Sequence, residues 1–420
     1  MRRLAERTIL VHCVTGADEY DRTEFAALAR AAGAEVVDAI VDRRSRPDAR
    51  SFIGRGKAQE LAARVAETGA GLVLVDDALT PAQERNLEQM LECRVLDRTG
   101  LILDIFAQRA RSFEGRLEVE RAQLRHLSTR LVRGWTHLER QKGGIGLRGP
   151  GESQLETDRR LIGQRIAHLD RRLERVQRQR AQGRERRRRT ATPVAALVGY
   201  TNAGKTTLFN ALSGAGAKTA DQLFATLDPL LRRIDIAGVG PVVIADTVGF
   251  VGRLPHELIE AFRATLTEAR DADVLIHVMD AAAPERATRR AAVNQVLAEI
   301  GAGGLPQIEV HNKCDLIEAA PGLHPRGDEG PERVYLSARD GSGLADLERS
   351  LARLLGVPET PVQLELEPDA GRLRARLFEL GAVLHESPRP GGGWFLELRL
   401  RATVLDRLLA EFSRRVAAEA

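Results

Sequence analysis

The chain has 420 residues, of which 43% are hydrophobic, and this apolar content excludes disorder along its whole length. At roughly 150 residues per domain, the length predicts about three domains. No stretch approaches the ~18 apolar residues of a membrane helix, and the N-terminus lacks the cleavage site of a signal peptide. The three cysteines, Cys13, Cys93 and Cys314, lie far apart, which argues against a disulfide framework or a zinc site. We therefore expect a soluble protein of a reducing cytoplasm.

Charge is nearly balanced over the whole chain, with 63 Lys and Arg against 59 Asp and Glu, but it is unevenly distributed. Residues 111–190 hold 22 basic and 10 acidic residues, an excess of 12 positive charges, while the remainder is net negative. A basic segment in an otherwise acidic protein indicates a polyanionic partner, and nucleic acid is the partner that we expect. The alternative is a solvated helical surface with no partner.

Residues 1–110 are predicted to form an α/β subdomain. Buried strands are expected at 8–14, 34–41 and 71–77, with helices at 24–32, at 57–68 and from Pro81. Strands that alternate with helices predict a parallel sheet. The sequence SFIGRGK, at 51–57, opens a helix with two glycines and a lysine; it is either an anion-binding helix start or a plain turn.

Residues 111–190 are predicted to form an antiparallel hairpin of two long helices. The apolar residues recur every seven positions, at Leu117, Leu124, Leu131 and Leu138 and again at Leu155, Ile162, Leu169 and Val176, with Leu127, Ile166 and Leu173 adding to the stripe. The glycine-rich stretch Gly143–Gly151, flanked by Lys142 and containing Arg148, would form the tip and suits a nucleic acid backbone. A dimerising coiled coil with an incidental linker is the alternative. The arginine run at 178–190 would face phosphate or form a flexible link.

Residues 191–357 are predicted to form a second α/β domain that begins with a phosphate-binding loop. A strand is followed by Gly199, Tyr200, Thr201, Asn202, Ala203, Gly204, Lys205, Thr206 and Thr207, which match G-x-x-x-x-G-K-[ST]. The glycines let backbone N–H groups close around phosphates at the positive end of a helix. Lys205 would reach the outer phosphates, and the Thr206 hydroxyl would bind Mg²⁺.

The base is predicted to be guanine. Asn312, Lys313, Cys314 and Asp315 end a strand as N-K-x-D, and Ser337, Ala338 and Arg339 follow another strand. The Asp315 carboxylate can accept hydrogen bonds from the guanine N1–H and exocyclic amine, a pair that adenine does not offer. The Lys313 stem can lie across the base, and the 337–339 loop would close around it.

Two further segments are predicted to sense the third phosphate. Asp246, Thr247, Val248 and Gly249 form D-x-x-G after a strand; Asp246 would hold Mg²⁺ through water, and the Gly249 N–H would meet the γ-phosphate. Upstream lie Phe224, Ala225, Thr226, Leu227 and Asp228, where Thr226 would complete Mg²⁺ coordination. We expect both segments to be switches, ordered by GTP and released after hydrolysis, with Lys205, Thr226 and Gly249 as the catalytic groups.

Residues 358–420 are predicted to form a small α+β unit of strand, helix, strand and helix that carries no recognisable chemistry. With the preceding segments, the fold class is α/β: an N-terminal α/β subdomain, a helical hairpin, and a phosphate-loop domain with a mostly parallel sheet and helices on both faces.

The ordered motifs GYTNAGKT, FATLD, DTVGF, NKCD and SAR resemble those of the translation-factor-related GTPases. The preceding GGIGLRGPGESQLETDRR, which joins two helices, resembles the HflX family over nearly the whole chain. The resemblance implies a cytoplasmic, monomeric bacterial GTPase that uses GTP, GDP and Mg²⁺. It further implies binding to the large ribosomal subunit, with the hairpin tip directed at the peptidyl transferase region, and separation of stalled or idle ribosomes under stress.

The resemblance also implies two further properties, ATP use by the N-terminal domain and peripheral association with a membrane. The sequence contains no second phosphate-loop motif, so SFIGRGK is the segment that could bind ATP. Two other function classes compete with a ribosomal role: a GTP-regulated factor that remodels or modifies other RNA, and a module that switches a protein partner. The basic segment disfavours the second.

Phe250 follows the D-x-x-G motif at the position where Ras-like GTPases carry a water-orienting glutamine. An apolar ring cannot orient the attacking water. We therefore expect slow intrinsic hydrolysis that accelerates on the ribosome, either because Phe250 retracts or because a group is supplied in trans.

Overall fold

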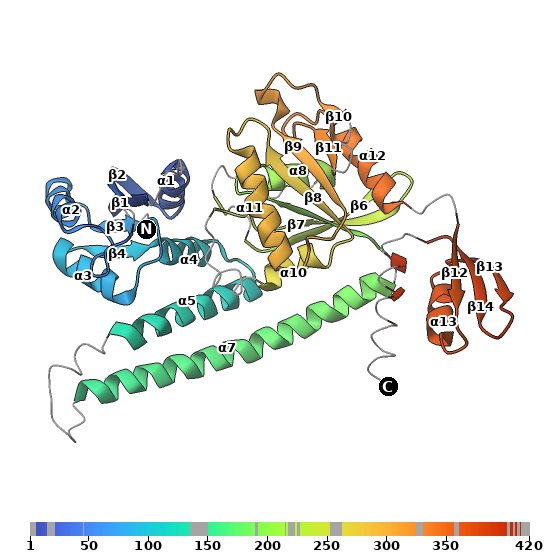
Figure 1. Ribbon diagram of the computed structural model, residues 1–420, viewed down its shortest axis with the longest axis horizontal. Helices are drawn as coiled ribbons and strands as arrows, with labels where there is room; N and C mark the ends of the chain where they lie inside the picture. Colours follow the sequence, from blue (N-terminus) through green and yellow to red (C-terminus); the bar gives the residue numbers. More distant parts are fainter. Residues whose placement is uncertain are drawn as a thin grey trace. The chain divides into compact units, whose positions relative to one another are not determined.

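A computed structural model (Figure 1) describes residues 6–14, 22–44, 46–134, 150–189, 192–214, 216, 223–224, 227–252, 263–324, 331–356 and 361–400, with a few residues beyond 403. The chain divides into two compact units. The first comprises Met1–Gln177, Ala220–Asp228 and Val251–Thr265, and the second comprises Arg178–Thr219, Pro229–Phe250 and Leu266–Ala420. Two short segments between strands of the second unit therefore belong to the first.

The described part of the first unit contains a sheet of four parallel strands in the order β2-β1-β3-β4. The strands and helices are β1 (Glu6–Val14), α1 (Arg22–Ala31), β2 (Ala34–Arg43), α2 (Arg55–Thr68), β3 (Leu72–Val75), α3 (Pro81–Leu91), β4 (Arg94–Asp97) and α4 (Arg98–Arg109). The core is aliphatic, with Ile9, Val11 and Val73 fully buried. The predicted parallel α/β arrangement is confirmed, while β4 and α4 were not predicted.

Two long helices follow, α5 (Phe113–Gly134) and α7 (Pro150–Arg189). In the first unit they run side by side (Figure 1), and Leu117 packs against Leu169 and Leu173. Arg172 lies over the Phe113 ring, and Arg165 pairs with Glu120 at 2.6 Å, so the contacts move backward along α7 as they move forward along α5, as an antiparallel hairpin requires. The heptad stripe therefore pairs within one chain.

The hairpin differs from the prediction in two places. Leu127, which was expected to join the apolar stripe, is 46% exposed. The arginine run continues α7 without a break as far as Arg189, which disfavours a flexible link; the alternative that it faces phosphate stays a prediction. The glycine-rich tip, including Lys142 and Arg148, lies outside the described residues.

The second unit is built on a seven-stranded sheet, counted over its described strands, in the order β10-β11-β9-β8-β5-β7-β6. Only the outermost pairs, β6 with β7 and β10 with β11, are antiparallel. The elements are β5 (Val194–Gly199), α8 (Lys205–Ser213), β6 (Leu230–Ile236), β7 (Gly240–Asp246), α10 (Arg263–Arg270), β8 (Val274–Asp280), α11 (Arg286–Glu299), β9 (Gln307–Asn312), a 3₁₀ turn (Cys314–Leu316), β10 (Gly322–His324), β11 (Glu332–Tyr335) and α12 (Leu344–Leu355). Central β5 is buried at every residue, as a parallel strand covered by helices on both faces should be.

Past residue 360, the described elements are β12 (Val362–Leu366), α13 (Gly371–Glu379), β13 (Val383–Pro388) and β14 (Trp394–Leu398). The three strands form an antiparallel sheet in the order β12-β14-β13. The α+β class was predicted, but β13 was missed because its side chains are mostly half-buried or exposed and give little apolar signal. Among the helices that the structure describes, none is long and apolar enough to cross a membrane.

The hairpin contact gives a test of the fold. Leu169 is fully buried between α5 and α7, so Leu169→Ala should remove about 2–5 kcal/mol from the stability of the first unit, by lost apolar burial and the cavity left behind. Urea unfolding followed by helical circular dichroism measures this loss. The matched control is Leu161→Ala on the same helix, where the side chain is 52% exposed and the expected change is below about 0.5 kcal/mol. Equal effects of the two substitutions would refute the packing.

Candidate nucleotide-binding site

The phosphate-loop sequence forms a strand, a turn and a helix start, as predicted. Strand β5 ends at Gly199, and α8 begins at Lys205 after Gly204, whose φ is +91°. A Cβ at Gly204 would lie 2.2 Å from the Asn312 side-chain nitrogen, so no larger residue fits between the loop and β9. The start of α8 therefore offers backbone N–H groups at the positive end of a helix.

Lys205 is buried at the centre of this loop. Its ammonium donates to the carbonyl oxygens of Gly199 at 3.0 Å and Tyr200 at 2.8 Å, and its residue is 6% exposed. Burial lowers the pKa of Lys205 to about 8, while the charge of nearby Asp246 opposes that shift. A dianionic phosphate placed beside it would restore the charged form.

Asn312 links three loops of the site. Its amide nitrogen donates to the Ala203 carbonyl at 2.8 Å, and its oxygen accepts from the Ala338 N–H at 2.9 Å. The residue is 2% exposed, so both halves of the amide are used inside the protein. Asn312 thereby fixes the phosphate loop to the Ser337–Ala338 turn.

The residues after Asn312 form the turn at which the sequence predicts the base site. Lys313 adopts a left-handed backbone with φ of +63°, and its ammonium pairs with Asp280 at 2.7 Å. Asp315 is exposed at the start of the next turn, while Cys314 is buried beneath it. Asp280 at the end of β8 was not singled out from the sequence; only its position at a strand end could have signalled it.

Thr206 and Asp246 bring two oxygen donors together. The Thr206 hydroxyl donates to the Asp246 carboxylate at 2.8 Å. Hydroxyl and carboxylate oxygens are hard ligands, and Mg²⁺ beside a phosphate takes few protein ligands and keeps several waters. The pair therefore fits a magnesium ion. No group of three or more His, Cys, Asp or Glu side chains that could hold a metal occurs among the residues described.

The segment Asp246–Gly252, which we call switch II, leaves β7 beside the phosphate loop. Phe250 pairs with the loop through its backbone, donating to the Gly199 carbonyl at 3.1 Å and accepting from the Thr201 N–H at 2.7 Å. Its side chain is buried. Thr247 is turned into the core, where its hydroxyl donates to the Leu197 carbonyl at 2.6 Å.

The upstream segment, predicted from FATLD, is only partly described. Phe224 packs edge-on against Phe106 of α4 at 4.6 Å between ring centroids, and Leu227 is buried. Asp228 accepts hydrogen bonds from the N–H groups of Arg111 at 2.9 Å and Ser112 at 2.7 Å. Ala225 and Thr226 lie outside the described residues, so the Mg²⁺ role of Thr226 stays a prediction.

The structure thus brings part of the predicted set together. The loop 199–207, Asp246, Gly249, Asn312, and the 337–338 turn gather at one edge of the sheet, joined by the contacts above. Phe224, Leu227 and Asp228 belong to the first compact unit and contact residues of that unit. Arg339 is exposed, and its contribution stays a prediction.

The N-terminal glycine motif, SFIGRGK at 51–57, makes contacts within the protein. The Gly54 N–H donates to the Asp42 carboxylate at 2.9 Å, and Lys57 pairs with Glu60 at 2.7 Å. The protein's own side chains therefore engage this helix start and its lysine, which favours the plain turn over an anion site.

Two histidines, His277 of β8 and His311 of β9, lie in the strands of this sheet. His277 is 1% exposed and lies 2.9 Å from the Gln307 side chain; burial, followed by the charge of Arg290, lowers the pKa of His277 to about 3. His311 stacks on Tyr335, and burial lowers the pKa of His311 to about 4. Both are neutral near pH 7, which accords with a structural role.

Three family models match consecutive parts of the chain. They are described as "GTP-binding GTPase N-terminal" over residues 19–107, "GTP-binding GTPase Middle Region" over 109–187 and "50S ribosome-binding GTPase" over 194–313. A protein named GTPase HflX from Escherichia coli strain K12 is 54% identical over 94% of this chain and 93% of its own length. The same-named protein from Caldanaerobacter subterraneus is 44% identical over 92% and 89%. A GTP-binding protein from Sulfolobus solfataricus, solved with GDP, is 24% identical over 83% and 98%, with a TM-score of 0.44.

The buried lysine predicts a pH dependence. Because Lys205 has a pKa near 8 in the free protein and is charged beside phosphate, GDP binding should take up a proton as pH rises through 8. The cationic form is fully populated well below pH 8, so affinity should be constant there and about fourfold weaker at pH 8.5. Calorimetry at pH 7.0 and 8.5, in buffers of different ionisation enthalpy, counts the protons. A binding enthalpy independent of buffer at pH 8.5 would contradict this assignment.

Proposed function

Because the chain belongs to the HflX family of GTPases, which makes it an enzyme that binds and hydrolyses GTP, we propose that it binds the large ribosomal subunit and separates stalled or idle ribosomes under stress. The observation that carries the proposal is the basic hairpin that precedes the GTPase domain. The name of the model matched at 194–313 supports a ribosomal partner.

In this proposal, different residues of the site bind different parts of the nucleotide. The phosphate loop and Lys205 hold the outer phosphates, and Thr206 and Asp246 hold Mg²⁺, which neutralises charge on those phosphates. Asp315 accepts the two guanine hydrogen bonds, and the Lys313 stem covers the base. Thr226 completes the metal site when GTP is present.

Hydrolysis in this proposal depends on positioning. The Gly249 N–H meets the γ-phosphate, and Lys205 stabilises the charge that develops as the phosphoryl group transfers. Phe250 has no group that could orient water, and its backbone is paired with the phosphate loop. The slow step in the free protein is therefore arrangement of the attacking water, which the ribosome corrects.

The hairpin supplies the RNA-binding surface. On its second helix, Arg159, Arg160, Arg171 and Arg175 are exposed along the described part. Arginines along a helix can neutralise phosphates and release counterions, which gives binding that weakens steeply with salt. The tip at 143–151, with Lys142 beside it, would extend this surface toward the peptidyl transferase region.

Hydrolysis with purified subunits tests the proposal. We expect GTP turnover to rise at least tenfold with large ribosomal subunits, and the stimulation to fade between about 50 and 200 mM salt. Lys205→Ala should bind no nucleotide and show neither rate. Small subunits are the control partner. An unchanged rate with large subunits would reject the ribosomal role, and stimulation by other structured RNA would favour an RNA remodelling or modification factor.

The base assignment has its own test. Asp315→Asn replaces an acceptor pair with one acceptor and one donor, so GTP affinity should fall at least tenfold because a guanine donor loses its partner. Xanthosine triphosphate, which carries a carbonyl in place of the amine, should bind the variant better than GTP. Competition with a fluorescent nucleotide measures both affinities. A variant that still prefers GTP would remove Asp315 from the base site.

A further inference from the structure

A second concentration of positive charge lies in the first unit, outside the hairpin. Residues 43–57, which we call the basic loop, run from the end of β2 into the first turn of α2. They hold one acidic residue, Asp48, and six basic residues, Arg43, Arg44, Arg46, Arg50, Arg55 and Lys57. The whole chain carries a net charge of only +4, so an excess of five positive charges in this short stretch is a local feature. A surface of this sign attracts a polyanion.

Most of these cations are not neutralised by the protein. Arg44 pairs with Asp42 at 3.1 Å, and Lys57 pairs with Glu60 at 2.7 Å. The side chains of the other four are exposed and make no ion pair or hydrogen bond with another residue of the described part of the chain; they are Arg43, Arg46, Arg50 and Arg55. The basic loop therefore presents guanidinium groups whose donors are available to a partner.

The loop is ordered by its own hydrogen bonds. The backbones of Asp48 and Phe52 exchange two of them, at 2.8 and 3.0 Å. The Asp48 carboxylate accepts from the N–H groups of Ser51 at 3.0 Å and Arg50 at 2.8 Å. These two bonds lower the pKa of Asp48, which is therefore charged near neutral pH. Because the turn that carries the arginines is already formed, less entropy is lost when they bind a partner.

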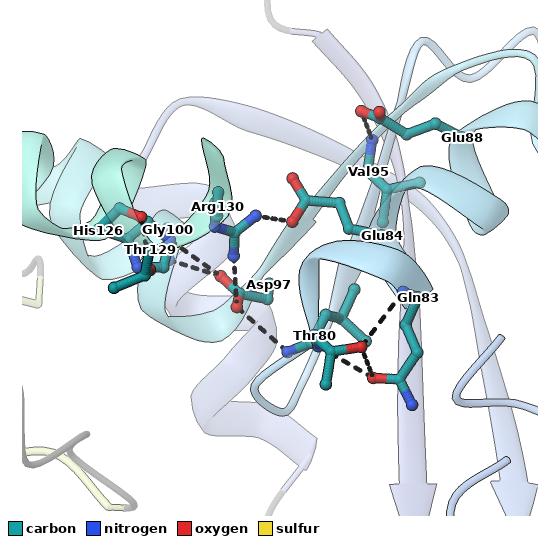
Figure 2. Close-up of polar contacts among 11 residues, drawn as sticks. Thr80, Gln83, Glu84, Glu88, Val95, Asp97, Gly100, His126, Thr129 and Arg130 are labelled. Atoms are coloured by element: carbon teal, nitrogen blue, oxygen red, sulfur yellow. Dashed lines mark hydrogen bonds and ion pairs between the residues drawn. The ribbon is translucent and has the colours of Figure 1, made fainter. Parts of the chain in front are cut away.

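Helix α3 supports the same turn. The Gln83 side-chain amide donates to the Asp48 carbonyl at 2.8 Å, and the Asn86 side-chain amide donates to the Arg50 carbonyl at 2.8 Å. Figure 2 shows how Gln83 is held in place, because its side-chain oxygen accepts from the Thr80 N–H at 2.9 Å in the capping box that begins α3. The basic loop is therefore bound to the first turns of α3.

The next residue of α3 holds the hairpin. Glu84 pairs with Arg130 near the end of α5, and Arg130 also donates to the Asp97 carboxylate at 2.8 Å (Figure 2). Asp97 is 1% exposed and accepts from the Gly100 N–H at 2.8 Å, so the contact is anchored in the α/β subdomain. Two consecutive residues of α3, Gln83 and Glu84, therefore hold the basic loop and α5, and all of these elements belong to the first unit.

We propose that the basic loop is a second RNA-binding surface, which contacts the phosphate backbone. Arginine suits this contact because its planar fork can donate to two phosphate oxygens at once. The Gly54 N–H at the start of α2 is already engaged by Asp42, and the free arginines are distributed along the loop, so the surface matches a chain of phosphates better than a single ion. That the RNA is part of the large ribosomal subunit rests on the proposed function.

An anionic membrane also presents many phosphates, but the loop lacks a feature that membrane binding uses. Peripheral segments combine basic residues with apolar side chains that enter the bilayer interface. The large apolar residues of the loop are Phe52 and Ile53, which are 4% and 1% exposed. RNA is therefore the partner that the observations favour.

Affinity for purified large ribosomal subunits, measured at several salt concentrations, tests the basic loop. The test variant is the full chain with Arg46→Gln, Arg50→Gln and Arg55→Gln. Each lost phosphate contact should reduce the slope of log affinity against log salt by about 0.7–0.9, so we expect a slope that is shallower by about two and an affinity that falls on the order of tenfold. GTP hydrolysis without subunits and the urea midpoint should not change.

The matched control removes the same charge from exposed positions elsewhere in the first unit, through Arg22→Gln, Arg30→Gln and Arg94→Gln. Charges that do not touch the RNA act on it only through screened, long-range attraction, so the control should keep the wild-type slope and an affinity within about twofold. A loop variant with the wild-type slope, or equal losses in the two variants, would overturn the proposal.

Two further probes separate the basic loop from the proposed function and from a membrane: a structured RNA of unrelated sequence, and vesicles of phosphatidylglycerol and phosphatidylcholine. Wild-type protein that does not bind subunits would reject the proposed function. A loss of affinity for the unrelated RNA in the loop variant alone would then still support the loop, while an unchanged affinity, or no RNA binding by the wild type, would overturn it. Vesicle binding that needs these arginines, with RNA binding unchanged, would overturn the choice of RNA.

Discussion

The parallel pairing of β5 with β7 and β8 is the constraint on which the nucleotide site depends. Parallel strands place their carboxyl ends at one edge of a sheet, so the loops after β5, β7, β9 and β11 meet there although they lie far apart in sequence. Asn312 then fixes the loops after β5 and β11 to each other through its amide. β5 is buried at every residue and β9 at four of its six residues, so the packed sheet holds the backbone groups at this edge in place.

The two segments predicted to sense the third phosphate each lie at a boundary, along the chain, between its two compact units. Phe250 is paired with the phosphate loop, whereas Gly252, two residues later, is held by Arg98 and Glu24 of the first unit. Asp228 likewise caps the start of α5 through Ser112.

Local patterns predicted most of the fold, because the strands of both α/β regions are short apolar runs and the phosphate-loop, D-x-x-G and N-K-x-D motifs each follow one. The apolar pattern did not predict β4 and α4. The strand has only four residues and runs directly into the helix, and the first turns of α4 are almost entirely buried, so they show no alternation of apolar and polar residues. The pattern also missed Arg98, Glu24 and Asp97, because their partners lie up to about 230 residues away and no spacing records such contacts. For Thr247 the motif predicted a place at the nucleotide. In the structure its hydroxyl instead donates to the Leu197 carbonyl in the core.

Sedimentation of purified 70S ribosomes tests the central claim most directly. Ribosomes would be mixed with the protein and GTP, a non-hydrolysable analogue or GDP, and separated on a sucrose gradient. The account predicts conversion of the 70S peak to subunits with GTP or the analogue, little change with GDP, and none with Lys205→Ala. A 70S peak that stays intact in the presence of GTP, under salt conditions in which the protein binds the large subunit, would contradict it.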